Sequence, residues 1–252
     1  EKAIDARTDL TDAEKEVAKK SARAEAESAI LGALTTPGTD RPLAILDLGA
    51  GSTDASIIDS RGQILAVHLA GAGDMVTMLI NSELGLENHH LAEDIKRYPL
   101  AKVESLFHIR HEDGPVQFFD KPLSGDLFAR VVIVKENDEF VPIDDGDYSI
   151  EKIKLVRQSA KERVFVTNAV RALKRVSPTQ NIRDIPFVVI VGGSALDFEI
   201  PQLVTEALSQ NAIVAGRGNV RGLVGPRNAV ATGLILTYVR EKWGVDYGIC
   251  LY

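Results

Sequence analysis

A loop of small residues that begins with a carboxylate occupies positions 47 to 53, where the sequence reads Asp-Leu-Gly-Ala-Gly-Ser-Thr. Backbone amides in such a loop can approach an anion closely, because few side chains stand in the way. The residues that offer a close amide or a hydroxyl are Gly49, Ala50, Gly51, Ser52 and Thr53. Asp47 would repel a bare phosphate, so its natural partner is a divalent cation or the water bound to one. The segment predicts a site for phosphate and metal, with an ordinary tight turn as the alternative.

Two later segments also combine small residues with a polar side chain. Gly192, Gly193 and Ser194 follow an apolar run, which predicts a strand, a glycine turn and then a helix. Such a turn suits close approach of a ligand to the backbone, and a plain strand-to-helix connection is the alternative. In the second segment, residues 225 to 233, a proline opens a helix and Arg227 projects from its start. Arg227 could bond a ligand or face solvent.

Short strands are predicted to hold these loops in place. Three short apolar runs follow one another along the chain, and residues 60 to 63 supply a turn between the last two. The runs are Leu43–Leu48, Ala55–Asp59 and Ile64–Leu69. They predict an antiparallel meander with Asp47 at the tip of its first strand. A fourth strand, Pro186–Val191, is apolar after its proline and is expected to be buried.

Helices are mixed with the strands along the chain. Thr11 and Glu14 can form a capping box, which predicts a helix from residue 11 to 34, followed by a linker at 35 to 40. The other predicted helices are 75–84, 91–107 with an end or kink near Pro99, 150–176, 200–210 and 229–240. A strand is expected at 129–134 and a loop at 136–147. This mixture predicts an α/β or α+β fold.

The composition excludes several classes of protein. With 252 residues, 45% of them hydrophobic and 26% charged, the chain can form a globular core. Its net charge of −7 argues against a nucleic-acid partner, which selects basic surfaces. The sequence contains no apolar run long enough to cross a membrane. Cys250 is the only cysteine, so an internal disulfide is excluded and a reducing cytoplasm is expected.

Five elements, in order, resemble the superfamily of actin, sugar kinases and heat-shock chaperones. They are the loop 47–53, the turn Gly71-Ala72-Gly73-Asp74, the helix positions Glu93, Lys96 and Arg97, the strand and glycine turn 188–194, and the helix start 226–233. In that superfamily, a nucleotide lies between two ribonuclease-H-like halves, and these elements belong to the second half. The resemblance implies an α/β fold with a mixed sheet flanked by helices and an inserted subdomain. It covers roughly residues 43 to 240.

Within this superfamily, the sequence most resembles the large subunits of diol and glycerol dehydratase reactivases. The segments that carry this resemblance are 46–56, 69–76, 161–168 and 216–219. The resemblance implies an ATP-dependent chaperone that releases damaged cobalamin from an inactivated dehydratase. Its partners would be the small subunit of the reactivase and an adenosylcobalamin-dependent diol or glycerol dehydratase. It also implies a cytoplasmic location, or one within a bacterial microcompartment.

The resemblance further implies a role for each site residue. ATP or ADP with Mg²⁺ would be the cofactor, and Asp47 would hold the metal or its water. Residues 49 to 53 would bind phosphate. Glu93 and Lys96 would bind the ribose or the adenine edge, and Arg97 would stack or bond nearby. Residues completing the adenosine pocket would be Gly192, Gly193, Ser194 and Arg227.

One departure from the superfamily limits the expected activity. The first phosphate loop of the superfamily is absent from this sequence, so the chain is expected to hold about half of the nucleotide site and to be inactive alone. The expected division is a leading helix and linker at 1–40, a first ATPase segment at 41–107, an inserted subdomain at 108–185 and a closing segment at 186–252. Two alternatives stay open: an actin-like interaction module without ATPase activity, and a small-molecule kinase of the same superfamily.

Overall fold

The structure is a computed structural model, and it describes residues 5, 7, 9–36, 43–58, 63–144 and 148–244. Most of the predicted linker at 35–40 and of the predicted turn at 60–63 lies outside the described residues. No helix within the described ranges is both long enough and apolar enough to span a bilayer.

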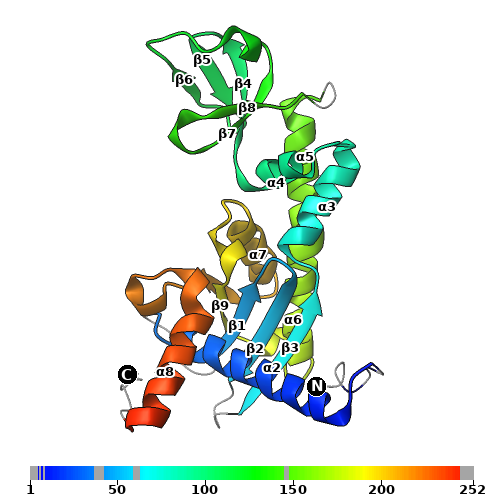
Figure 1. The fold of residues 1–252 in the computed structure, drawn as a ribbon, viewed down its shortest axis with the longest axis vertical. Coiled ribbons are helices and arrows are strands. Elements are labelled where there is room, and N and C mark those ends of the chain that lie inside the picture. Colours follow the sequence, from blue (N-terminus) through cyan, green and yellow to red (C-terminus); the bar gives the residue numbers. More distant parts are fainter. Residues whose placement is uncertain are drawn as a thin grey trace.

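A five-stranded mixed sheet forms the lower part of the molecule in Figure 1. Its strands, in the order β10-β9-β1-β2-β3, are β10 (Val214–Arg217), β9 (Phe187–Val191), β1 (Leu43–Leu48), β2 (Ser52–Ile58) and β3 (Ile64–Ala70). The first three strands along the chain pair antiparallel, and β9 pairs parallel to both β1 and β10. The predicted meander is therefore confirmed, whereas β10 was not anticipated.

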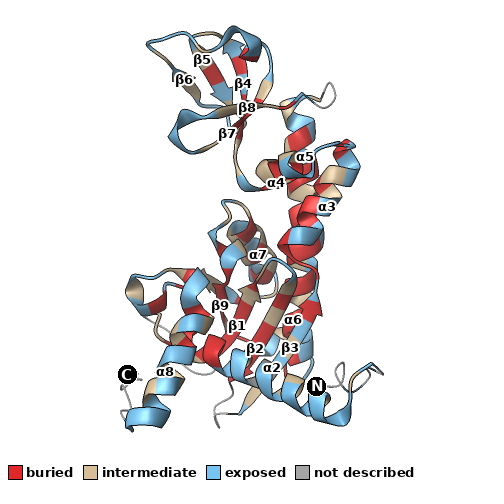
Figure 2. Ribbon diagram, viewed as in Figure 1, coloured by how far each residue is buried: buried red, intermediate tan, exposed pale blue. Residues whose placement is uncertain are grey.

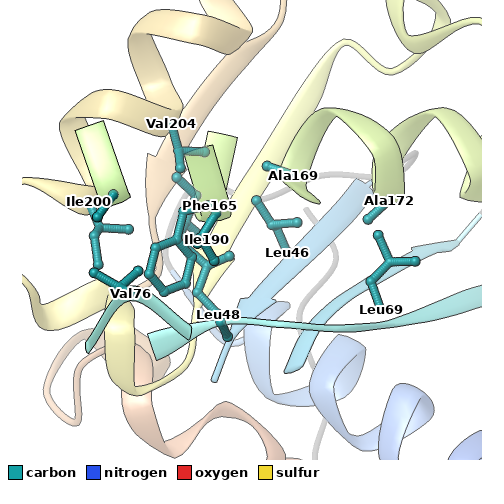
Figure 3. Close-up of a cluster of buried hydrophobic side chains, with 14 of the residues drawn as sticks. Leu46, Leu48, Leu69, Val76, Phe165, Ala169, Ala172, Ile190, Ile200 and Val204 are labelled. Atoms are coloured by element: carbon teal, nitrogen blue, oxygen red, sulfur yellow. The ribbon is translucent and has the colours of Figure 1, made fainter. Parts of the chain in front are cut away.

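Helices cover both faces of this sheet. On one face, α6 (Thr167–Val176) and α7 (Ile200–Ser209) pack on Leu46 and Leu48, as Figure 3 shows. On the other face, α2 (Asp12–Ala33) and α8 (Ala229–Trp243) pack on Leu43 and Ile45. Side chains alternate between the faces of a strand, and both faces of β1 are buried, so β1 is apolar throughout until Asp47.

A long helical rod connects this sheet to the upper part of the molecule (Figure 1). It consists of α5 (Ile150–Lys161), a π-helical turn (Glu162–Val166) and α6. The hydroxyl oxygen of Ser149 caps the start of α5 by accepting a hydrogen bond from the amide of Lys152. The sequence predicted one helix with an imperfect apolar period, and the π turn accounts for that imperfection, because it shifts the phase of the buried face by part of a turn.

A second sheet of five antiparallel strands forms the upper part. Its strands, in the order β6-β5-β4-β7-β8, are β6 (Val116–Phe118), β5 (His108–His111), β4 (Leu100–Ser105), β7 (Val131–Val134) and β8 (Phe140–Pro142). The expected strand near 129–134 is confirmed as β7. The expected loop at 136–147 was wrong in part, since it contains β8.

The helix expected at 91–107 is a second correction. Helix α4 (His89–Arg97) ends before Pro99, and β4 follows it directly. Lys102 and Glu104 are exposed while Ala101 and Val103 are buried, which is the period of a strand and not of a helix. The second sheet therefore begins before residue 108, where the inserted subdomain was expected to start. The division into domains stays a prediction.

Helices α2 and α8 cross at unusually close range. A Cβ atom added to Gly32 of α2 would lie 1.8 Å from the carbonyl oxygen of Ala229, and one added to Gly233 of α8 would lie 1.8 Å from that of Ser28. Each glycine thus faces the backbone of the other helix. The residues at the crossing are buried, whereas the outer sides of both helices are exposed, as Figure 2 shows.

We expect Gly233→Ala to destabilise the protein by about 2 kcal/mol. The new methyl group must push two packed helices apart, and such overpacking typically costs ~1–3 kcal/mol, more than the better helix propensity of alanine returns. Urea unfolding measures the difference. Gly216→Ala in β10 is the control, because nothing lies within 4 Å of its added Cβ. Equal stability of the two variants would contradict the close crossing.

Candidate functional site

The loop between β1 and β2 is held by its own backbone and by the next turn of the chain. The Gly49 amide donates to Ser52 O at 3.0 Å, and the amides of Gly71 and Asp74 donate to Gly51 O and Ala50 O at 2.9 and 2.8 Å. Ala50 and Gly51 are exposed. Within the described part of the chain, their own amides donate no hydrogen bond. The loop thus combines fixed geometry with two amides that can bind an anion.

Asp47 stands at the end of β1, directly across from Asp54 of β2. Burial and, to a lesser degree, the nearby carboxylates of Asp54 and Glu25 together raise the pKa of Asp47 to about 6. Asp54 itself accepts the Ser52 hydroxyl at 2.9 Å and lies 2.5 Å from Nδ1 of His68. Asp47 is therefore a carboxylate that a cation would stabilise. The described residues contain no group of three or more His, Cys, Asp or Glu side chains able to hold a metal ion.

The glycine turn after β9 packs against the same loop. Ser194 donates its hydroxyl hydrogen to Gly49 O at 2.9 Å. Gly192 has φ +94°, and a Cβ added to it would lie 2.3 Å from Oδ1 of Asp47. The Gly192 amide donates to Pro226 O at 3.0 Å, which brings the 3-10 turn that precedes α8 (Pro226–Asn228) to the glycine turn. Gly193 follows with open space where its Cβ would be.

The Glu93 and Lys96 side chains lie close to this group, through α3 (Gly73–Leu84). Lys96 is 9% exposed, and its ammonium group bonds Gly73 O at 3.2 Å, Thr77 Oγ1 at 2.8 Å and Glu93 Oε2 at 2.6 Å. The Gly73 amide in turn donates to Gly49 O at 3.3 Å. All three hydrogens of the ammonium group therefore have partners inside the protein.

The half-buried Glu93 carboxylate is held in its charged form. Burial pushes the pKa of Glu93 up, but the hydrogen bonds from Lys96 and Thr77 outweigh burial and leave the pKa below its ordinary value. Only Oε2 of Glu93 takes part in these bonds, at 2.6 Å from each partner. The helix therefore presents an ionised carboxylate whose orientation Lys96 fixes.

The remaining predicted residues lie differently from one another. Thr53 is fully buried and donates its hydroxyl hydrogen to Gly71 O at 3.1 Å, so this hydroxyl anchors the neighbouring turn and does not face a ligand. Arg97 and Arg227 are exposed. The guanidinium of Arg97 lies 5.4 Å from the centre of the Tyr98 ring. Within the described residues, neither arginine bonds the loop at 49–52.

Two contributors were missed by sequence reasoning. Asn168, from α6, donates to Gly71 O at 2.8 Å and is buried, and Thr77 bridges Gly73 O and Glu93. Each is a polar residue on the buried side of a helix, which is the signal that could have identified it. Both fix the turn at 71–74 and, through it, the loop.

Comparison with known proteins assigns a family to this fold and site. A family model described as "Diol dehydratase reactivase ATPase-like domain" matches residues 5–238. The chain is 72% identical over 218 residues to the propanediol dehydratase-reactivating factor large subunit of Salmonella typhimurium (strain LT2). That alignment covers 86% of this chain and 35% of the relative, so the chain spans about a third of that relative's length.

Solved structures agree with this assignment. A glycerol dehydratase reactivase is 62% identical, with a TM-score of 0.80 over 92% of this chain and 39% of the other. MreB5 of Spiroplasma citri, solved with ADP, is 20% identical, with a TM-score of 0.50 over 96% of this chain and 69% of the other. The second likeness concerns the fold alone, and it confirms the predicted α/β actin-like ATPase fold. The chain therefore belongs to the diol dehydratase reactivase ATPase-like domain family.

Proposed function

We propose that this chain forms the second half of the nucleotide site in the large subunit of a dehydratase reactivase. In that subunit, ATP hydrolysis drives a conformational change that releases damaged cobalamin from an inactivated dehydratase. The partners are the small subunit of the reactivase and an adenosylcobalamin-dependent dehydratase. A diol dehydratase is favoured as the client, because identity to the propanediol-type relative, 72%, exceeds the 62% to the glycerol-type reactivase.

One observation carries the nucleotide assignment: an exposed loop with two amides free to bind an anion stands next to Asp47, whose charged form is disfavoured by burial and by neighbouring carboxylates. A phosphate chain with Mg²⁺ satisfies both needs at once. Mg²⁺ is usually bound by one or two carboxylates together with phosphate oxygens, so Asp47 with the nucleotide suffices without an all-protein metal cluster. The metal would neutralise charge that develops on the phosphates.

The neighbouring residues then receive roles that fit their contacts. Residues 49 to 52 bind phosphate oxygens through backbone amides, and Asp47 holds Mg²⁺ or its water. The ionised Glu93 carboxylate accepts a ribose hydroxyl, while Lys96 positions it and does not itself touch the ligand. The turn Gly192-Gly193-Ser194 forms the adenosine side of the site. Arg97 and Arg227 close over the nucleotide from their exposed positions.

Two other functions make different predictions. An interaction module without ATPase activity would bind no nucleotide, and a small-molecule kinase would release a phosphorylated product. The free loop amides and the raised pKa of Asp47 favour the ATPase. A site that no longer binds nucleotide has no physical reason to keep a carboxylate whose charged form is disfavoured beside a loop that can bind an anion.

The test is nucleotide titration and phosphate release, made on the isolated 252-residue chain and on the whole large subunit that carries it. We expect the chain alone to bind nucleotide weakly and to show no meaningful turnover. Catalysis requires positioned groups on both sides of the phosphates, and this chain supplies one side. The whole subunit is expected to hydrolyse ATP.

Each alternative has its own outcome in these measurements. Robust Mg²⁺-dependent turnover by the isolated chain would show that the assignment to one half of the site is wrong. Absence of nucleotide binding by the whole subunit would favour the interaction module, and a phosphorylated small molecule would favour the kinase.

A further inference from the structure

A cluster of five charged side chains lies buried between the second sheet, the helical rod and the glycine turn. Its members are Arg157 and Lys161 of α5, Glu112 after β5, and Asp197 and Glu199 before α7. Arg157 forms two hydrogen bonds to Glu112, at 2.8 and 2.9 Å, and two to Glu199, at 2.7 and 2.9 Å. Lys161 bonds Asp197 at 2.7 Å and Glu199 at 2.8 Å.

The two cations are fully buried, and this is unusual for structural ion pairs. Arg157 and Lys161 are both 0% exposed, and the side chains of their carboxylate partners are 6 to 11% exposed. The Phe198 ring covers them, with its centre 4.9 Å from the guanidinium and 4.4 Å from the ammonium. Buried ion pairs add little net stability compared with apolar residues. Separating the two partners is nevertheless costly, because it leaves a buried charge unpaired, so the partners hold each other in place. The cluster therefore serves position more than stability.

The lower end of the cluster holds the glycine turn. Asp197 Oδ1 accepts a hydrogen bond from Lys161 and others from the amides of Glu199 and Ile200, at 2.9 and 3.0 Å, so this carboxylate holds the backbone at the start of α7. The Asp197 amide donates to Ser194 O at 3.2 Å. Ser194 in turn bonds Gly49 O. A continuous series of contacts thus runs from Lys161 to the loop at 49–52.

The upper end of the cluster belongs to the second sheet. The Glu112 amide donates to Leu100 O at 2.9 Å, which ties Glu112 to β4. Arg157 also donates to Tyr98 O at 3.3 Å, and Lys154 donates to Glu112 O at 3.2 Å. Figure 1 shows the rod running from this sheet down to the level of α7. Arg157 and Lys161 therefore hold both ends at once.

We propose that Arg157 and Lys161 are positioning residues that couple the second sheet to the turn Gly192–Leu196. A displacement of Glu112 moves Arg157 and so changes the hydrogen bonds that Glu199 accepts from Arg157 and Lys161. The position of Lys161 then changes its bond to Asp197, and with it the position of the turn. The position of the second sheet and the geometry of the proposed nucleotide site thereby depend on each other. The part that concerns the nucleotide rests on the proposed function, whereas the coupling between sheet and turn does not.

The test compares variants of the whole large subunit in two measurements, amide hydrogen exchange and ADP titration. Glu112→Gln removes a charge from the second sheet and touches nothing in the turn. We expect it to speed exchange at the Asp197, Glu199 and Ile200 amides and to weaken ADP binding, each by about tenfold. Lys161→Met should do the same, and Lys161→Arg should restore both values.

The control variant lies on the same rod. Arg163→Met breaks the exposed ion pair of Arg163 with Glu83, which has no contact with the turn, and should leave exchange at 197–200 and ADP affinity unchanged. Faster exchange confined to residues 98–112 in Glu112→Gln would overturn the coupling, as would a response of Arg163→Met equal to that of Glu112→Gln. If the unmodified subunit binds no ADP, the proposed function fails, and the exchange measurement still decides the coupling.

Discussion

Replacing Gly192 with alanine is expected to destabilise the protein by about 3–5 kcal/mol and to abolish nucleotide binding. Two separate costs add at this position. The backbone has φ +94° and ψ 173°, a region that residues with a Cβ almost never adopt. Holding a non-glycine residue there costs on the order of 1–3 kcal/mol. The second cost is steric and arises from the site itself.

The added methyl group would meet three atoms that cannot move aside easily. It would lie 2.3 Å from Oδ1 of Asp47, 2.5 Å from Leu48 O and 2.8 Å from Leu48 N. Two of these belong to the backbone of a central strand with both faces buried, so β1 and β9 would have to separate. Overpacking of this type costs a further ~1–3 kcal/mol. Displacing Asp47 and the loop that follows it would also disturb the phosphate side of the proposed site.

Gly193→Ala is the matched control for this prediction. It changes the next residue in the same turn, but nothing lies within 4 Å of its added Cβ and its φ is not in the left-handed region. We expect stability close to that of the unmodified protein. Urea unfolding and ADP titration of both variants provide the measurement, and a Gly192→Ala variant as stable as Gly193→Ala would show that the strand and the turn are not packed as described.

The sequence predicts the β1–β2–β3 part of the first sheet well, although not β10, because local and tertiary signals agree there. Leu43 to Leu48 is apolar on both sides of the strand, and Asp47 interrupts the run just before a loop of small residues. Strand propensity, turn chemistry and burial thus all indicate one hairpin. The helix start at Thr11 is equally local, and the capping box with Glu14 is present in the structure.

The second sheet could not be predicted in the same way. Its strands are short and partly exposed, and β6 and β8 have three residues each. Their pairing depends on partners distant in the chain, which a local pattern does not contain. Pro99 signalled the end of a helix, but the strand that follows became evident only from the burial of Leu100, Ala101 and Val103.

The sequence predicted which segments meet at the candidate site, but it did not predict the contacts of each side chain there. The loop, the glycine turn and α4 are joined by bonds through Gly49 and Gly73. The spacing of Glu93 and Lys96 could not reveal that Lys96 is buried and saturated by internal partners. Nor could spacing show that the hydroxyl of Thr53 points to Gly71. Such facts depend on which polar groups share one buried volume.

A second large effect is expected from Asp47→Asn in the whole large subunit, where ATP turnover should fall at least ~100-fold while the fold becomes slightly more stable. Removing one preorganised electrostatic group at a phosphoryl-transfer site typically costs this much in rate. Asparagine has the same shape, but it lacks the charge that would hold Mg²⁺ or its water. The loss should therefore be in turnover and not in folding.

The gain in stability follows from the sign of the pKa shift. The pKa of Asp47 rises from 3.8 to about 6 because burial and the neighbouring carboxylates disfavour its charged form, so the ionised folded protein carries a penalty at neutral pH. Asparagine removes that penalty, which contributes about 1 kcal/mol, less than the full pKa change implies because the carboxylate is partly solvated. A residue whose removal stabilises the fold but stops turnover is retained for function.

Asp54→Asn separates this role from a general effect of charge. It removes the other carboxylate of the same cross-strand pair, with the same change of shape, and relieves the same repulsion. Because burial of the Asp47 charge remains and the Asp54 carboxylate itself accepts the Ser52 hydroxyl and lies beside His68, we expect less stabilisation than in Asp47→Asn, with turnover reduced by less than about tenfold. Phosphate release and urea unfolding of both variants make the comparison. If Asp47→Asn turned over ATP about as fast as the unmodified subunit, Asp47 would not be a ligand of the proposed metal. Among the described residues, no other carboxylate ends a strand at this loop and could take its place.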